Sequence, residues 1–261
     1  YLAPRWSTTA VARRHDIPVR EVPPLSAWTD RVQAVNAANA DVLISVLFPF
    51  RVPVDVLDRF GDKAVNLHPA LLPAYRGHQA VLAMILDCSI LKQACVTAHV
   101  MDAGFDTGSV ITRQPVAFAK GNCLTRFSIE TARATYALSR SELPRYFDGD
   151  ADAVPQEESN AHYCRVSRSE IEIGPNLDFD SAQLLCATLG SQAPLPLSAA
   201  ANVKIIGFER KLGPPLAQPP KIRLLSVDAD VADARIRLKR KRPWSGALRK
   251  LKRLAVLISA R

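Results

Sequence analysis

The chain has 261 residues, with 34 Lys and Arg against 25 Asp and Glu, so its formal net charge is +9. Hydrophobic residues make up 48% of the sequence and charged residues 23%, a composition that is typical of folded globular proteins and excludes wholesale disorder, collagen and a coiled-coil rod. No apolar run approaches the ~18 residues of a transmembrane helix, and no signal peptide is visible at the start. The length allows one large domain, or one domain with a smaller one.

The cysteines point to a reducing compartment. There are five of them, an odd number at wide spacings, and no C-x-x-C pair occurs, so the sequence does not indicate a disulfide framework. Most lie inside apolar stretches, where a free Cys behaves as a small hydrophobic residue. We therefore expect buried, reduced thiols in a cytoplasmic protein.

Strand-like and helix-like segments alternate along the first 150 residues. Residues 41–48, DVLISVLF, are almost wholly apolar, which is typical of a strand that is covered on both faces. The alternation predicts an α/β layered fold. The predicted strands are 41–48, 65–68, 95–101 and 109–118, and the predicted helices are 26–40, 79–91 and 124–143.

The composition changes after about residue 150. The stretch DGDADAVPQEESN is acidic and broken by Pro, so we predict a linker over 151–160. Beyond it we predict a small, mainly β unit over 161–234, with a rigid Pro-rich loop at 213–220. Its strand-like segments are 162–166, 203–210, 222–227 and 235–240, and its one helix is 181–189.

The positive charge is concentrated at the end of the chain. Residues 235–261 hold eleven Lys and Arg and no acidic residue, whereas the remainder of the chain has a net charge of −2. Ala247, Leu251, Leu254 and Ile258 recur at helical spacing between basic residues, which predicts a basic amphipathic helix. Such a helix suits an anionic membrane surface, nucleic acid or the groove of a partner. The alternative is a solvated tail that rests on its own body.

The chemistry-bearing residues begin in the segment NLHPALLPAYRG, residues 66–77. Asn66 and His68 are two residues apart at the end of a predicted strand, so their side chains lie on the same face of the sheet. The ends of strands are where α/β sheets bind ligands. An amide donor beside an imidazole can stabilise an oxyanion and move a proton, as acyl transfer requires. A structural His that caps a loop is the alternative.

A second segment, MDAGFDTG at residues 101–108, follows the next predicted strand. It offers two carboxylates, Asp102 and Asp106, and two glycines. Asp106 is placed to orient the His68 ring and to favour its cationic form. By itself the segment also fits a turn between two strands.

Together, the two segments closely resemble those of the folate-dependent formyltransferase superfamily, which includes enzymes that act on methionyl-tRNA, glycinamide ribonucleotide and amino sugars. The matching residues are Asn66, His68, Leu71, Leu72, Pro73 and Gly77 in the first segment and Asp102, Asp106 and Gly108 in the second. The resemblance covers residues 10–145 well. It implies a Rossmann-like sheet with helices on both faces in a catalytic domain over 1–150, which lacks the first strand–helix unit of the family.

The resemblance also implies a reaction and its participants. Enzymes of this family move a formyl group from 10-formyltetrahydrofolate to a primary amine without a metal ion. Their catalytic Asn, His and Asp fall on Asn66, His68 and Asp106. The residues expected to contact the folate are Phe48, Phe50, Val52, Leu72, Asp102 and Gly104.

The acceptor amine is left open between two classes, methionyl-tRNA and an amino-sugar nucleotide. We expect Arg76 to project from its loop and to contact an anionic part of either acceptor, because a guanidinium binds phosphate or carboxylate through two parallel bonds. The basic tail over 235–261 suits contact with tRNA or a peripheral position on an anionic membrane. The alternative function is a non-catalytic binding module on a truncated formyltransferase scaffold.

Overall fold

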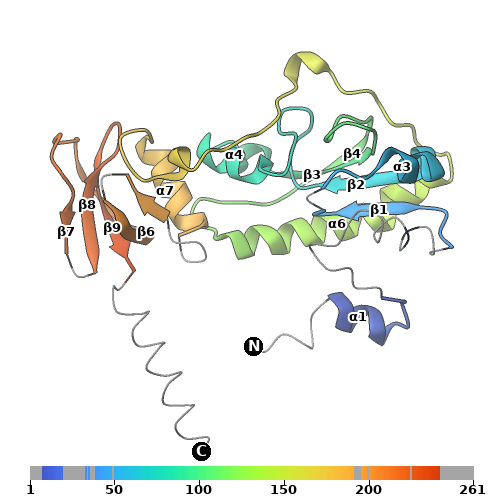
Figure 1. Cartoon of the computed structure of the whole chain (residues 1–261), viewed down its shortest axis with the longest axis horizontal. Coiled ribbons are helices and arrows are strands. Elements are labelled where there is room, and N and C mark those ends of the chain that lie inside the picture. Colours follow the sequence, from blue (N-terminus) through green and yellow to red (C-terminus); the bar gives the residue numbers. More distant parts are fainter. Residues whose placement is uncertain are drawn as a thin grey trace, which may run out of the picture.

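The structure is a computed structural model (Figure 1) that describes residues 8–19, 33, 35, 39–48, 50–190, 195–198, 200–223 and 225–241. The predicted helix over 26–40 falls mostly outside this part of the chain, and the predicted amphipathic helix at 247–258 falls wholly outside it. No helix in the described ranges has the length and apolar character needed to cross a membrane. None of the five cysteines forms a disulfide.

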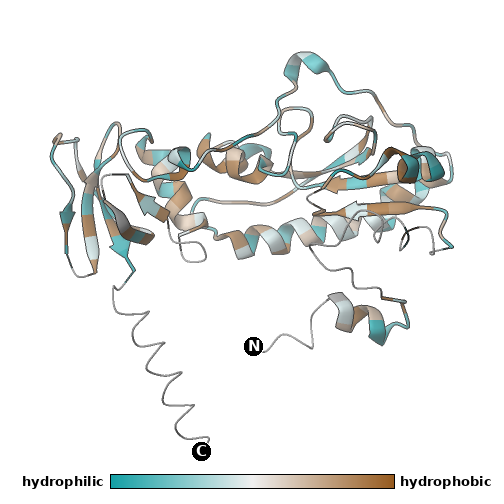
Figure 2. Ribbon diagram, in the orientation of Figure 1, coloured by the Kyte–Doolittle hydropathy of each residue, from teal (hydrophilic) through white to brown (hydrophobic). Residues whose placement is uncertain are grey.

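The first sheet has four described strands in the order β1-β2-β3-β4. Strand β1 (Leu43–Val46) runs parallel to β2 (Ala64–His68), and β2 is antiparallel to β3 (Cys95–Val100), which is antiparallel to β4 (Val110–Pro115). Figure 2 shows the brown, hydrophobic residues along β1 and β2 that the apolar pattern of the sequence predicted. The predicted α/β sheet is confirmed. The prediction that the strand within 41–48 is covered on both faces is wrong, because Ile44 and Val46 on one face of β1 are 46% and 47% exposed.

Helices pack around this sheet. The longest, α6 (Leu124–Phe147), runs along one side of it in Figure 1 and packs on β3 and β4. Its buried residues Phe127, Ala134 and Leu138 are seven and four residues apart, so one helical stripe faces the core. The others are α1 (Thr8–Arg14), α3 (Val54–Phe60), α4 (Ala80–Leu86) and α5 (Ile90–Gln93). The helix predicted over 79–91 is interrupted between α4 and α5, where Cys88 has a φ of 60° that no continuous right-handed helix allows.

The second sheet confirms the predicted mainly β unit. Its antiparallel strands have the spatial order β5-β6-β9-β8-β7, and a helix, α7 (Phe179–Thr188), packs on both β6 and α4. The two sheets therefore share one continuous hydrophobic core. The strands are β5 (Leu195–Leu197), β6 (Ala200–Gly213), β7 (Lys221–Ile222), β8 (Ser226–Asp230) and β9 (Arg235–Arg240).

Strand β9 lies in the middle of this sheet, so the prediction of a separate basic tail that starts at residue 235 is wrong. Ile236 and Leu238 are fully buried in the core. On the same strand, Arg235 pairs with Asp230 at 2.8 Å and Arg237 pairs with Asp228 at 2.6 Å. Acidic residues of β8 thus neutralise the arginines, which is why a run of positive charge can form a central strand. Only the residues after 241 remain as a candidate tail.

Two short strand predictions in this region are wrong. The segment 162–166 forms no strand; it makes one parallel bridge, between Tyr163 and Arg76. The segment 222–227 is divided between β7, which ends at Ile222, and β8, which begins at Ser226.

The segment predicted as a linker, 151–160, packs against the two loops that carry the sequence motifs. Val154 and Val110 exchange backbone hydrogen bonds of 2.8 Å in both directions. Further along, the amide of Arg76 donates to the carbonyl of His162 at 2.8 Å. The connection between the two sheets is therefore fixed to the first sheet at both of its ends (Figure 1).

Candidate active site

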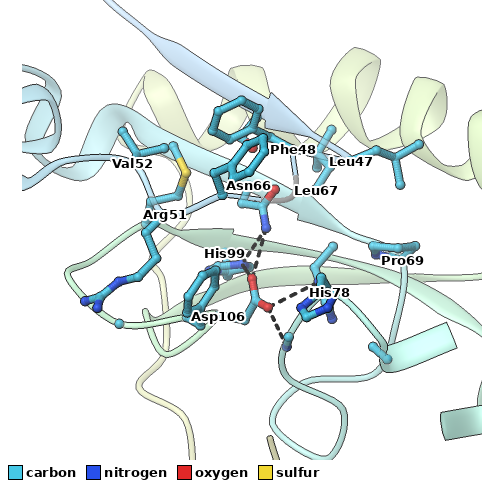
Figure 3. A pocket seen from close by; sticks show the side chains of 18 of the residues that line it. Leu47, Phe48, Arg51, Val52, Asn66, Leu67, Pro69, His78, His99 and Asp106 are labelled. Carbon is cyan, nitrogen blue, oxygen red and sulfur yellow. Dashed lines mark hydrogen bonds and ion pairs between the residues drawn. The ribbon is translucent and has the colours of Figure 1, made fainter. Parts of the chain in front are cut away.

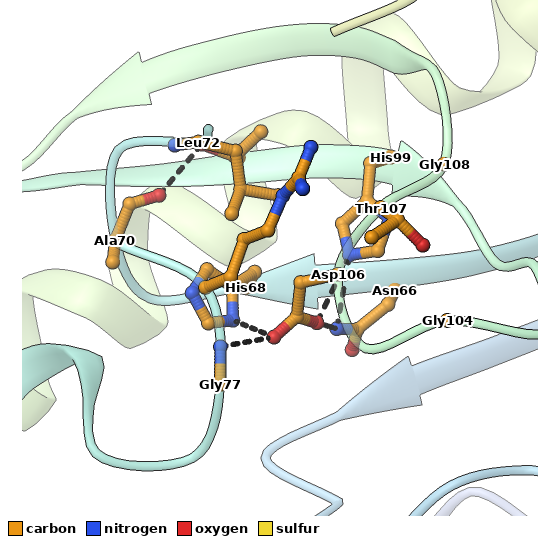
Figure 4. A network of polar contacts seen from close by, with 12 residues as sticks. Asn66, His68, Ala70, Leu72, Gly77, His99, Gly104, Asp106, Thr107 and Gly108 are labelled. Carbon is orange, nitrogen blue, oxygen red and sulfur yellow. Dashed lines mark hydrogen bonds and ion pairs between the residues drawn. The ribbon is translucent and has the colours of Figure 1, made fainter. Parts of the chain in front are cut away.

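The site lies where β2 ends. Asn66 and His68 share one face of β2, as their spacing predicted, and they lie opposite His99 and Thr97 of the antiparallel neighbour β3. Asp106 comes from the loop between β3 and β4 and has a φ of 56°. Among non-glycine residues, Asp and Asn accept this left-handed conformation most readily. The structure brings the three predicted catalytic residues together (Figure 4).

The carboxylate of Asp106 is the centre of the cluster. Its Oδ1 accepts from Nδ2 of Asn66 at 3.1 Å and lies 3.4 Å from Nε2 of His99. Its Oδ2 accepts from the amide of Gly77 at 2.7 Å and lies 3.6 Å from Nδ1 of His68. Burial by itself would raise the pKa of Asp106, but the contact with His99, the charge of His68 and the Gly77 amide outweigh burial and lower that pKa to about 2. Asp106 is therefore ionised at neutral pH.

His68 lies at the floor of the site, where its surroundings favour the neutral ring. Nε2 of its ring contacts the carbonyl oxygen of Tyr75 at 2.7 Å, which requires Nε2 to carry the donated proton. Nδ1 then faces Asp106 without a proton. Burial lowers the pKa of His68 more strongly than the Asp106 charge raises it. The expectation that Asp106 favours the cationic ring is thus right in direction, but burial outweighs it.

His99 is a member of the cluster that the sequence analysis missed. It is 2% exposed, its Nδ1 contacts the carbonyl of Val100 at 2.7 Å, and its Nε2 lies 3.2 Å from Nδ2 of Asn66. The alternating strand CVTAHVM held the signal, because a period of two places Thr97 and His99 on one face. What the sequence did not show was the register that sets His99 opposite Asn66.

A pocket opens in front of this cluster (Figure 3). Five of the predicted folate contacts, Phe48, Phe50, Val52, Asp102 and Gly104, line it together with Asn66, His68 and Asp106. The rings of Phe48 and Phe50 meet edge to face, with their centroids 5.5 Å apart, and give the pocket an apolar wall. Further lining residues that the sequence analysis did not single out include Arg51, His78 and Phe105.

Two predicted site residues do not line the pocket. Leu72 is 1% exposed, and its carbonyl accepts from Arg113 at 2.9 Å, so it belongs to the core beneath the site. Arg76 does not project from its loop. Its buried guanidinium donates to Glu158 at 2.7 and 3.1 Å and to Gln156 at 2.9 and 3.2 Å. These acceptors lie in the segment predicted as a linker, where the sequence gave no sign of contact with the loop.

The loop that carries Asp106 is shaped by its own side chains. Oδ1 of Asp102 accepts from the hydroxyl of Thr107 at 2.6 Å and from the amide of Gly104 at 3.0 Å. A Cβ on Gly108 would overlap the carbonyl oxygen of Val100. The turn interpretation of this segment is therefore confirmed, and the same turn carries Asp106 to His68 and Asn66. No group of three or more His, Cys, Asp or Glu side chains within the described ranges is arranged to hold a metal ion.

An amide donor, an imidazole and an ionised carboxylate meet beside an apolar pocket at the end of a strand, an arrangement that suits acyl-type group transfer. Residues 12–135 match the family model described as formyl transferase. Over these residues the resemblance to the formyltransferase superfamily is confirmed.

Relatives and solved structures agree with this assignment. Methionyl-tRNA formyltransferase of Dictyoglomus turgidum is 29% identical over 157 residues, which cover 60% of this chain and 49% of the relative. The N-formyltransferase from Helicobacter canadensis has the same fold, with a TM-score of 0.65 and 19% identity over 90% of this chain and 83% of that one. HypX from Aquifex aeolicus gives a TM-score of 0.61 with 18% identity, over 92% of this chain and 42% of HypX. The chain spans about half the length of the methionyl-tRNA formyltransferases that it matches.

Proposed function

We propose that this protein transfers a formyl group from 10-formyltetrahydrofolate to a primary amine. The observation that carries the proposal is that Asn66 and His68 both contact the carboxylate of Asp106, beside a pocket with an apolar wall. In the balanced reaction a C–N bond forms between the amine and the formyl carbon, the bond from that carbon to the folate nitrogen breaks, and one amine proton moves to the folate nitrogen.

Each residue has a distinct task in this reaction. One N–H of Asn66 donates to Asp106, and the second faces Nε2 of His99 at 3.2 Å. In this proposal the second N–H turns from His99 to the formyl oxygen as negative charge develops there. His68 is neutral, so it accepts the proton of the attacking amine and passes it to the leaving nitrogen. Asp106 stays ionised and stabilises the imidazolium that forms in between.

The pocket walls fit the proposed cosubstrate. Phe48, Phe50 and Val52 offer an apolar surface for a flat ring system, and polar groups of the 102–106 loop lie across from it. The Helicobacter canadensis protein was solved with folinic acid and HypX with tetrahydrofolic acid, which supports a folate in this position.

The test is formyl transfer measured for the protein and for its Asn66→Ala, His68→Ala and Asp106→Ala variants. Loss of an oxyanion donor costs ~10²–10³ in rate and loss of an acid or base ~10²–10⁴. If all three variants keep the wild-type turnover, the assigned site is wrong. If the protein binds the folate but transfers no formyl group to any acceptor, the binding-module alternative replaces the proposal.

The acceptor is either methionyl-tRNA or an amino-sugar nucleotide. The first is supported by the methionyl-tRNA formyltransferase relatives, and the second by the Helicobacter canadensis structure, which contains dTDP-3-aminofucose. Turnover measured with both acceptors under the same conditions decides between them.

A truncation tests whether the basic tail takes part. The chain should be ended after Lys241, because the amide of Lys241 bonds to the second sheet and an earlier end would remove β9. If residues 242–261 contact tRNA, their removal weakens acceptor binding and lowers the slope of log K against log salt by roughly 0.7–0.9 per lost phosphate contact. If they lie on a membrane, their removal releases the protein from anionic vesicles and leaves turnover with a soluble acceptor intact.

A further inference from the structure

Gln156 uses the hydrogen-bonding capacity of its side chain to join two loops. Its Nε2 donates to the carbonyls of Asp106 and Gly108, at 2.9 and 2.7 Å. Its Oε1 accepts from Nε and Nη2 of Arg76, at 3.2 and 2.9 Å. The amide side chain is therefore bonded at both ends, to the loop that carries Asp106 and to the loop that carries Arg76.

The residues on either side of Arg76 hold the two catalytic side chains. The carbonyl of Tyr75 accepts from Nε2 of His68 at 2.7 Å, and the amide of Gly77 donates to Asp106 at 2.7 Å. The Arg76 side chain thus fixes the one stretch of backbone that contacts both His68 and Asp106. Gln156 connects this stretch to the backbone of Asp106 itself.

The Asp106 loop needs such a restraint. A non-glycine residue at a φ of 56° lies in a sparsely populated conformation that persists only where surrounding contacts hold it. Gln156 donates to the carbonyl of this residue and to that of Gly108, two residues further on. Backbone bonds between Val154 and Val110 anchor the chain just before Gln156, so the side chain starts from a fixed point.

From these contacts we infer that Gln156 is a positioning residue, which sets the distance between His68 and Asp106 by bracing their two loops. It does not line the pocket and acts through its neighbours. The inference rests on the proposed function where it concerns turnover, but the geometry that it assigns to His68 and Asp106 can be measured separately.

Two substitutions of Gln156 distinguish a positioning role of its side chain from a role in packing alone. Gln156→Met keeps the length of the side chain and removes every hydrogen bond. Gln156→Glu keeps the acceptor for Arg76 but replaces the two donated bonds with a negative charge beside two carbonyls. Because this charge pairs with the Arg76 guanidinium, the variant is expected to stay folded even if Gln156→Met does not. The matched control is Glu158→Gln, because the amide oxygen of the variant still accepts from the same guanidinium and the side chain at this position is 72% exposed. Arg76 therefore keeps a partner there, and only a charge is removed.

A displacement of about 1 Å between reacting groups costs on the order of 10²-fold in rate. We therefore expect both Gln156 variants to lower kcat by ~10- to 100-fold, with the KM of the folate changed by less than ~threefold, and Glu158→Gln to keep kcat within ~twofold. Nitrogen NMR of the His68 ring gives the second readout. Asp106 raises the pKa of His68, so a larger distance between the two side chains should lower that pKa further.

The inference is overturned if both Gln156 variants match Glu158→Gln in kcat and in the pKa of His68. A fall in stability with an unchanged kcat and an unchanged His68 pKa overturns it as well, because that is what packing alone predicts. If the wild-type protein transfers no formyl group, the proposed function fails. The NMR titration of His68 then tests by itself whether Gln156 positions His68 and Asp106.

Discussion

Replacing Asp106 with Asn removes one charge beside His68 and leaves the shape of the side chain unchanged. Nδ1 of His68 lies 3.6 Å from Oδ2 of Asp106, and both side chains are almost fully buried. At this distance a full charge pair is worth about 4 kcal/mol at an effective dielectric constant of ~20. If half to all of the imidazolium charge develops in the transition state, the loss is about 2–4 kcal/mol, or roughly 30- to 1000-fold in kcat.

The assay is single-turnover formyl transfer as a function of pH. Since the carboxylate raises the pKa of His68, the Asp106→Asn variant should also shift the acidic limb of the profile to lower pH. Asp230→Asn is the control, because Asp230 is equally buried, at 11% exposed, and pairs with Arg235 far from the pocket. We expect Asp230→Asn to lower stability and to leave kcat unchanged. A wild-type kcat and an unmoved acidic limb for Asp106→Asn would refute the role given to this charge.

Three further predictions concern titration and packing. In the wild-type protein, kcat should fall as the pH drops through a pKa below 6.5, because burial lowers the pKa of His68 and the neutral ring is the working form; a limb above 6.5 contradicts this. Gly108→Ala should destabilise the fold by about 1–3 kcal/mol in urea unfolding, because the added Cβ overlaps the carbonyl of Val100. Hydrogen bonds from Arg237 lower the pKa of Asp228 from 3.8 to about 2, so stability is lost as the pH falls between these values. Asp228→Asn should flatten acid unfolding in that range.

The order of elements could be predicted because each depends on local pattern. The apolar run at 41–48 became β1, and the helical stripe of Phe127, Ala134 and Leu138 became the buried face of α6. The predictions failed where long-range contacts decide. The strand-like segment 235–240 was predicted and is β9, but its assignment to the basic tail was wrong. Arg235 and Arg237 resemble a solvated basic run in sequence, and pairing with Asp230 and Asp228 of β8 makes them part of a central strand.

The geometry of the candidate cluster was predictable for a related reason. Asn66 and His68 are set on one face by the period of the strand, and Asp106 is carried by a recognisable loop, so sequence spacing contains most of the geometry. His99 and Arg76 behave differently. The position of His99 depends on the register of β3 against β2, and the position of Arg76 depends on acceptors some 80 residues away.

Composition alone predicted a solvated linker over 151–160, whereas this segment packs against the loops of the first sheet. Polar, acidic and Pro-containing sequence is typical of a solvated connection, yet Gln156 and Glu158 in this stretch use their polar groups as acceptors for Arg76. A buried guanidinium must be paired, and within the described part of the chain Glu158 is the carboxylate that pairs with Arg76. The polar residues of the connection therefore stabilise a cation beneath the active site, and the same contacts tie the connection to the loops that carry His68 and Asp106.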